Sequence, residues 1–121
     1  MTKKYIPETA KARSWNEIEE HFTKWFDEVY TDNIAKLAQH INSSELSERL
    51  FAYTSMDKLV VSIYNPIEWN REALHITFDQ HIQNWTFEYY TKPFQKTEFI
   101  RHYPAEKGIE KFDKFIKMIK W

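Results

Sequence analysis

Residues 74–90 read LHITFDQHIQNWTFEYY, and this stretch decides the fold that the sequence predicts. Apolar residues alternate with polar ones from Leu74 to Phe78, and the same period of two returns from Trp85 to Tyr89. That period is typical of β-strands with one buried face. Because the join between the two runs is short, the strands are expected to pair antiparallel.

The alternation extends outward from this hairpin in both directions. Residues 58–64 carry the same pattern, and residues 49–54 and 96–102 carry weaker forms of it. Short joins separate neighbouring runs, apart from the longer stretch of residues 65–72. Since parallel strands need long crossovers, we predict a four- or five-stranded antiparallel meander. Clean alternation gives that sheet one buried face and one more polar face.

Helical periodicity precedes the strands. Ser14 and Glu17 have the spacing of a capping box, which predicts a helix start at Ser14. Two apolar stripes follow, and they comprise Ile18, Phe22, Trp25 and Val29, then Ile34, Leu37, Ala38 and Ile41. The stripes differ in direction by roughly 130° around a helix axis, so one straight helix cannot bury both. We predict a kink or break around residues 31–33, where Thr31 or Asp32 can cap a second segment.

The helical period returns after Pro104. The apolar stripe of this last segment comprises Ile109, Phe112, Phe115, Ile116 and Ile119. Both helical regions must bury their stripes, and the apolar face of the sheet offers the surface for them. The prediction is a two-layer α+β fold, with an N-terminal broken helix and a C-terminal helix packed on one face of the sheet. Residues 1–13 are expected to form a flexible N-terminal arm, and residues 14–121 a single domain.

Composition excludes several classes of function. The 121 residues include no cysteine, which excludes disulfides, thiol catalysis and cysteine-ligated zinc. One glycine is too few for a phosphate-binding loop or a dinucleotide-binding fingerprint, and we expect no cofactor. No apolar run approaches the roughly 20 residues that span a bilayer, and no signal-peptide pattern follows the first lysines. We therefore expect a cytoplasmic protein.

Charge argues against nucleic acid and membrane surfaces as partners. The net charge is -1, and the lysine-rich residues 105–121 carry five lysines against three acids. Nucleic-acid-binding proteins show a larger basic footprint. The five histidines are His21, His40, His75, His81 and His102. None of them forms the i, i+4 pair of a helical zinc motif, so we predict no metal site.

The polar face of the predicted sheet is the first candidate surface. Its side chains can bind a small polar ligand, or they can form ordinary cross-strand pairs on a solvated face or a homodimer contact. Arg101 or His102 joins this face, depending on the parity of the last strand. The candidate ligand-binding residues are Tyr64, His75, Glu88, Tyr90 and Arg101.

The acidic N-terminal helical region is the second candidate surface. Residues 14–42 carry six acids against two bases, and an acidic patch can speed and orient the approach of a basic partner. Tryptophan is enriched among the residues that dominate binding energy, so two tryptophans are candidate anchors. The candidate partner-binding residues are Trp15, Glu19, Glu20, Asp27, Glu28 and Trp69. The simpler alternative is a solvated helix face.

No catalytic motif occurs in the sequence, so we predict no catalytic residues. The order of helix, meander and helix is similar in outline to small bacterial immunity proteins, which bind and block a toxin. The leading hypothesis is a small non-enzymatic cytoplasmic domain that docks a basic protein partner in this inhibitor-like manner. The alternative is a ligand-binding protein or enzyme on the polar sheet face. There Glu88 or His75 would act as the acid–base group, and Arg101 would orient an anion.

Overall fold

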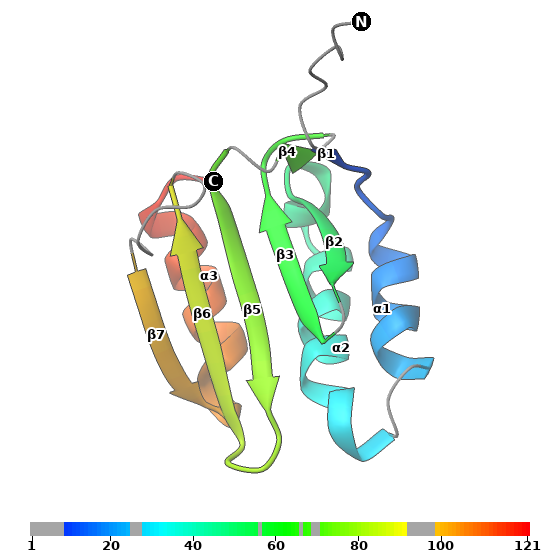
Figure 1. The fold of residues 1–121 in the computed structure, drawn as a ribbon, viewed down its shortest axis with the longest axis vertical. Helices are drawn as coiled ribbons and strands as arrows, with labels where there is room; N and C mark the ends of the chain where they lie inside the picture. Colours follow the sequence, from blue (N-terminus) through cyan, green and yellow to red (C-terminus); the bar gives the residue numbers. More distant parts are fainter. Residues whose placement is uncertain (1–8, 25–27, 56, 66, 69–70, 92–98) are drawn as a thin grey trace, which may run out of the picture.

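Two layers, one of helices and one of strands, make up the computed structural model (Figure 1). The structure describes residues 9–24, 28–55, 57–65, 67–68, 71–91 and 99–121. The helices are α1 (Trp15–Lys24), α2 (Glu28–Asn42) and α3 (Gly108–Met118), with short 3-10 turns η1 (Glu45–Glu48) and η2 (Ala105–Lys107). The strands are β1 (Thr9–Ala10), β2 (Phe51–Ser55), β3 (Lys58–Ser62), β4 (Ile67–Glu68), β5 (Ala73–Asp79), β6 (Asn84–Tyr90) and β7 (Phe99–Pro104).

The main sheet has the strand order β2-β3-β5-β6-β7, and every neighbouring pair is antiparallel. This arrangement confirms the predicted meander in its five-stranded form. It also confirms the α+β class: α1 contacts β2, α2 contacts β5 and α3 contacts β7, and α2 and α3 lie behind the sheet in the view of Figure 1. Sequential antiparallel pairing follows from the short joins, because each strand returns directly beside the one before it.

A second, two-stranded ribbon was not predicted. In it β1 pairs antiparallel with β4, so that Thr9 lies opposite Glu68 and Ala10 opposite Ile67. The chain then runs to Arg13, whose backbone N–H donates to the carbonyl of Ala52 at 2.8 Å. Residues 9–13, which we assigned to the N-terminal arm, therefore contact the domain through backbone hydrogen bonds.

The predicted start of α1 is confirmed in detail. The backbone N–H of Glu17 donates to Ser14 Oγ at 3.1 Å, and the backbone N–H of Ser14 donates to Glu17 Oε1 at 3.4 Å. These two bonds are the reciprocal pair of a capping box, and they satisfy backbone donors that the helix itself leaves without acceptors.

The predicted position of the helix break is wrong, although the break itself exists. Residues 31–33 lie inside α2, which already begins at Glu28, while α1 ends at Lys24. The two helices run antiparallel side by side (Figure 1). The reversal lets both stripes reach one core: Ile18 and Phe22 of α1 are buried, and so are Leu37 and Ile41 of α2.

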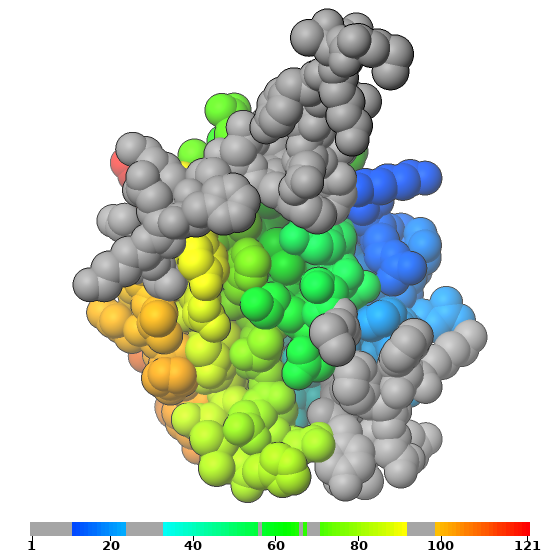
Figure 2. Space-filling model, in the orientation of Figure 1, coloured from blue at the N-terminus to red at the C-terminus, as the bar shows by residue number. Residues whose placement is uncertain are grey.

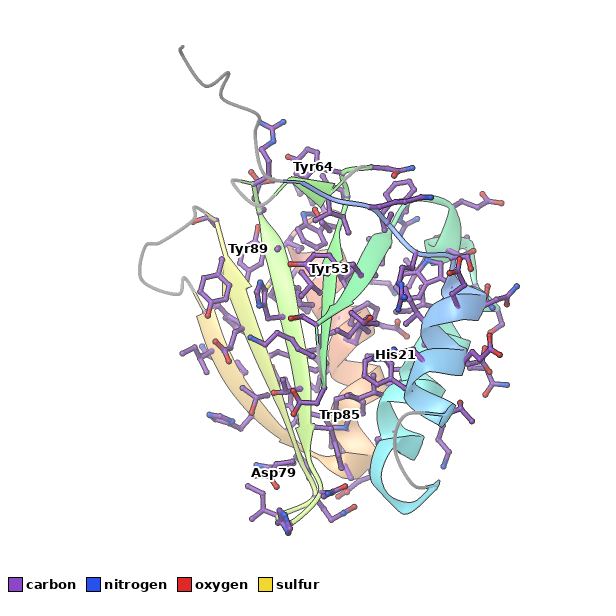
Figure 3. The ribbon with its side chains drawn as sticks, turned by 45° about the vertical axis from the view of Figure 1, so that its right-hand side comes forward. His21, Tyr53, Tyr64, Asp79, Trp85 and Tyr89 are labelled. Carbon is purple, nitrogen blue, oxygen red and sulfur yellow. The ribbon has the colours of Figure 1, made fainter. Side chains whose placement is uncertain are left out.

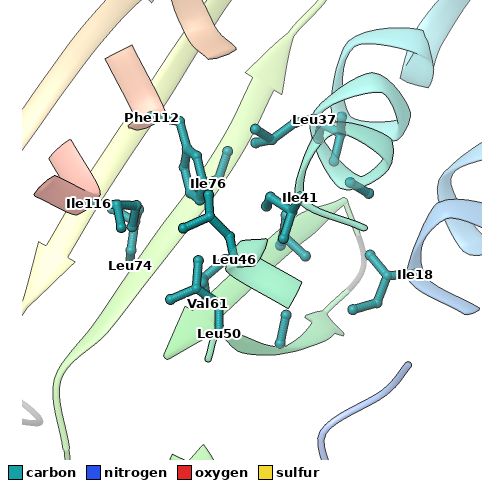
Figure 4. Close-up of a cluster of buried hydrophobic side chains, with 14 of the residues drawn as sticks. Ile18, Leu37, Ile41, Leu46, Leu50, Val61, Leu74, Ile76, Phe112 and Ile116 are labelled. Atoms are coloured by element: carbon teal, nitrogen blue, oxygen red, sulfur yellow. The ribbon is translucent and has the colours of Figure 1, made fainter. Parts of the chain in front are cut away.

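One hydrophobic core lies between the helices and the inner face of the sheet (Figure 4). Alternate strand residues enter it, among them Val61, Leu74 and Ile76, and Phe112 and Ile116 of α3 close it from the other side. Because the period of two sends every second side chain inward, the intervening residues form the outer face. Among the described residues, no helix is long and apolar enough to cross a bilayer.

Candidate functional site

The outer face of the sheet brings three of the five candidate ligand-binding residues together. His75 lies directly opposite Glu88 across the β5–β6 pair, and Ala73 lies opposite Tyr90. Figure 2 shows this face, which the helices do not cover. His75 and Glu88 belong to one cross-strand row with Val60 of β3 and Ile100 of β7, so the face combines polar and apolar side chains.

Tyr90 connects the other two members of this group. Its hydroxyl donates to Glu88 Oε2 at 2.6 Å, and its ring meets the His75 ring edge-on with 4.8 Å between centroids. A short hydrogen bond to a carboxylate is a strong one, so Glu88 and Tyr90 fix each other's orientation. We call His75, Glu88 and Tyr90 the outer-face cluster.

His75 is the perturbed group of the outer-face cluster. Its pKa is lowered from 6.5 to about 4, mainly by burial and also by the nearby Lys58, while Glu88 opposes both effects. Its Nδ1 atom is buried and has no hydrogen-bond partner among the described residues. A histidine with this pKa is neutral near pH 7 and binds a proton too weakly to serve as an efficient general base there.

Tyr64 lies at the end of the sheet opposite the Asp79 turn (Figure 3). Its hydroxyl donates to Glu72 Oε2 at 2.6 Å, and this bond raises the pKa of Tyr64. The guanidinium of Arg71 lies 4.5 Å from the centroid of the Tyr64 ring. Tyr64 thus forms a group with Arg71 and Glu72.

The structure also contradicts the placement of Arg101 on the outer face. Arg101 lies opposite Phe87, which is fully buried in the core, so its side chain belongs to the helix-covered side of the sheet. Its guanidinium lies 4.4 Å from the centroid of the Phe99 ring. His102 takes the outer-face position instead, and its Nδ1 is 3.0 Å from Thr86 Oγ1.

The five candidate ligand-binding residues thus divide: His75, Glu88 and Tyr90 share the outer face, Arg101 lies on the helix-covered side, and Tyr64 bonds to Glu72. The strand register decides whether Arg101 or His102 lies on the outer face. Arg101 lies opposite a buried residue of β6, whereas His102 lies in one cross-strand row with Thr86 and Thr77 on the outer face. Without Arg101, no cation from this set faces the outer-face cluster. The sequence reasoning missed Lys58, which lowers the pKa of His75 and comes from the neighbouring strand β3.

The candidate partner-binding residues divide differently. Trp15 is buried, with 6% of its surface exposed, and its Nε1 donates to the Leu50 carbonyl at 3.1 Å. Trp15 is therefore a core residue, and its proposed role as an exposed anchor is wrong. Glu19 is half-buried and Glu20 is exposed, both on α1. Asp27, Trp69 and the side chain of Glu28 lie outside the described part of the chain.

Trp15 was misassigned because it directly follows the capping residue, where side chains are often exposed. It lies on the same side of α1 as Ile18 and Phe22, since spacings of three and seven return to one helical face. The spacing could have identified Trp15 as a core residue.

Comparison with known proteins adds no functional assignment. No protein-family model, no curated protein and no solved structure matches this chain. Within the residues that the structure describes, no group of three histidine, aspartate or glutamate side chains has the arrangement of a metal site. The candidate sites consequently rest on their own geometry.

Proposed function

We propose that this chain is a small, non-enzymatic, cytoplasmic domain that binds a basic protein partner through the acidic side of its helical layer. The observation that carries the proposal is a charge gradient across that layer. Helices α1 and α2 carry five acids against two bases, whereas residues 105–121, which include α3, carry five lysines against three acids. Because α2 lies between α1 and α3, the acidic and basic helices occupy opposite ends of the layer (Figure 1).

A gradient of this kind gives an approaching protein a preferred orientation. A basic surface is attracted to the α1 end and repelled from the α3 end, which raises the association rate more than the final affinity. Glu17 and Glu20 lie on the solvent side of α1, opposite the buried Ile18 and Phe22. An inhibitor of the immunity-protein kind would use such steering to reach its target before damage occurs.

The neutral state of His75 weighs against an enzyme on the outer face of the sheet. An acid–base catalyst needs a pKa near the working pH, and His75 is far below it. The cation that would orient an anion, Arg101, lies on the other side of the sheet. Binding of a small polar molecule by the outer-face cluster is the second candidate function, supported by the gathering of His75, Glu88 and Tyr90.

The test of the first proposal has two steps. The protein is immobilised, incubated with extract of the cells that produce it, and any stoichiometric partner is identified by mass spectrometry. Association of the purified partner is then followed by stopped-flow fluorescence with wild-type protein and with Glu20→Lys. We expect the variant to associate several-fold more slowly at low salt, with a difference that shrinks as salt is added.

Glu106→Lys is the matched control, because Glu106 is exposed at the basic end of the layer and the change in net charge is the same. It should leave the association rate close to wild type. Failure to recover a stoichiometric partner, or equal slowing by both variants, would contradict the proposal. For the second candidate, an NMR titration with small polar molecules should shift the amide signals of His75 and Glu88 before others.

A further inference from the structure

The outer edge of β7 is the least protected edge of the main sheet. β7 has six residues, and in the described part of the chain it pairs with β6 alone. The opposite edge, β2, is partly closed, because Arg13 bonds to the Ala52 carbonyl and donates from Nη1 to Thr54 Oγ1 at 3.1 Å. A long open edge strand is a template on which another extended segment can add.

A backbone hydrogen bond at the end of β7 determines which of its peptide groups face outward. The N–H of Ala105 donates to the Gln83 carbonyl at 3.0 Å, in register with the β6–β7 pair. Since alternate residues of an antiparallel strand bond to the same neighbour, Tyr103 and Arg101 also bond toward β6. Ile100 and His102 therefore direct their N–H and C=O groups away from the sheet.

A side chain already occupies one of these outward groups. Arg101 Nη1 donates to the Ile100 carbonyl at 2.8 Å, which agrees with the outward direction of that carbonyl. Pro104, the last residue of β7, has no N–H to offer. The open acceptor and donors that remain for a new strand are therefore concentrated at Ile100 and His102.

The helix-covered side of this edge is positively charged. Arg101 lies over the Phe99 ring, and Lys111 of α3 lies with Nζ 5.6 Å from the centroid of the Tyr103 ring. The aromatic rings hold both cations beside β7. The nearby Glu110 pairs with Lys107 and Lys114. A segment added to β7 would therefore place every second side chain beside two anchored cations.

We propose that the outer edge of β7 binds an extended acidic segment of a protein partner by strand addition, and that Arg101 forms an ion pair with this segment. The partner's backbone bonds to the outward groups of Ile100 and His102, and its carboxylates pair with Arg101 and Lys111. Arg101 leaves the neutral Ile100 carbonyl for a carboxylate, because a charge-assisted hydrogen bond is the stronger of the two. That exchange frees the carbonyl for the incoming strand.

Charge selects this occupant over a second copy of the chain. β7 itself carries the cation Arg101 and no acid, so two copies of β7 paired edge to edge would bring like charges together. An acidic segment removes the repulsion and adds attraction. This surface is distinct from the acidic α1 end, so the proposal does not depend on the proposed function.

Amide hydrogen exchange tests the geometry directly. In the free protein, NMR should find fast exchange at Ile100 and His102 and slow exchange at Arg101 and Tyr103. The probe is a synthetic peptide in which glutamate alternates with valine, and its addition should slow exchange at Ile100 and His102 selectively. Unchanged exchange at these two amides in the presence of saturating peptide would overturn strand addition.

Fluorescence anisotropy with the labelled peptide tests the charge. We expect the glutamate peptide to bind at least about tenfold more tightly than a lysine–valine peptide, a difference of about 1.4 kcal/mol. The same glutamate peptide with N-methylated valines should lose binding, since it lacks the N–H groups that a strand needs. Equal affinity for these three peptides, or preference for single-stranded oligothymidine over all of them, would overturn the proposal.

Arg101→Glu should weaken the glutamate peptide at least about tenfold. Lys117→Glu is the matched control, because Lys117 is exposed on α3 and the change in charge is the same. Ile100→Pro should also abolish binding while circular dichroism stays that of the wild type, since the N–H it removes does not bond to β6. Equal weakening by Arg101→Glu and Lys117→Glu would overturn the role of Arg101.

Discussion

The one glycine of the chain is required by a single side chain, the indole of Trp85. Gly108 begins α3 with an ordinary helical backbone, φ -59° and ψ -49°, so its conformation suits any residue. A Cβ atom at this position, however, would overlap the ring of Trp85. The glycine therefore serves close approach of helix and sheet rather than a turn.

Gly108→Ala should destabilise the protein by about 1–3 kcal/mol, because the methyl group must push the indole or α3 aside. Urea unfolding followed by circular dichroism measures the change. The loss should be smaller when Gly108→Ala is made in a Trp85→Phe background, where the smaller ring leaves room. An equal loss in both backgrounds would show that the indole is not the obstacle.

His75 predicts a particular dependence of stability on pH. Its folded pKa of about 4 lies below the unfolded value of 6.5, so the unfolded chain binds the proton more tightly. Its contribution to stability is therefore complete above about pH 6.5 and is lost as the pH falls toward 4. His75→Gln should lose less stability than wild type over this range.

Urea midpoints measured across that pH range check the expectation. His81→Gln, in the exposed turn between β5 and β6, is the control substitution. Plots of urea midpoint against pH that run parallel for wild type and His75→Gln would contradict the proposed contribution of His75.

Arg101 shows where single-residue prediction from the sequence reached its limit. Along residues 99–103, apolar side chains occur on both faces of the strand. Phe99 and Tyr103 share one face with Arg101, and Ile100 lies on the other. The core selects Phe99 and Tyr103, whose rings pack against it, and Arg101 shares their parity. Ile100 remains 45% exposed on the outer face. Packing of the two aromatic rings therefore determines which face of β7 is turned toward the core. The alternation in the sequence alone does not distinguish the two faces.

At the scale of elements, the capping box of α1 is the clearest local signal that the sequence carried. Ser14→Ala should destabilise the protein by about 1 kcal/mol, since the N–H of Glu17 loses its acceptor. Ser43→Ala removes a hydroxyl just after the last residue of α2, where Oγ donates to the His40 carbonyl at 3.3 Å. This control should have a smaller effect in the same urea measurement. Equal effects would show that the capping bond does not matter.

The order and direction of the main strands followed from the sequence, because alternation and short joins act locally. The position of the helix break did not follow. The two apolar stripes point in different directions, which requires the helix to break somewhere between them. Their directions do not specify the residue at which the break occurs. Thr31 and Asp32 looked like caps, yet both lie within α2. The pairing of β1 with β4 was also unpredictable, since two residues are too few to show a period.

At the scale of the whole molecule, one core joins all three helices to the five main strands. His40 of α2 also bonds through Nε2 to Asp113 of α3 at 2.9 Å, which links the two parts of the helical layer. A single core of this size should unfold in one cooperative step. Tryptophan fluorescence and far-ultraviolet circular dichroism should therefore give the same urea midpoint. Two separate midpoints would show that α1 and α2 unfold independently of α3.

The contact between Trp85 and the start of α3 also makes the molecule its own optical reporter. The indole donates from Nε1 to the Ala105 carbonyl at 3.0 Å and is almost completely shielded from water. Detachment of α3 from the sheet would expose this ring to water and shift its fluorescence emission to longer wavelength. A version of the chain that keeps only this tryptophan would thus make the opening of that helix visible in a cuvette, without any attached dye.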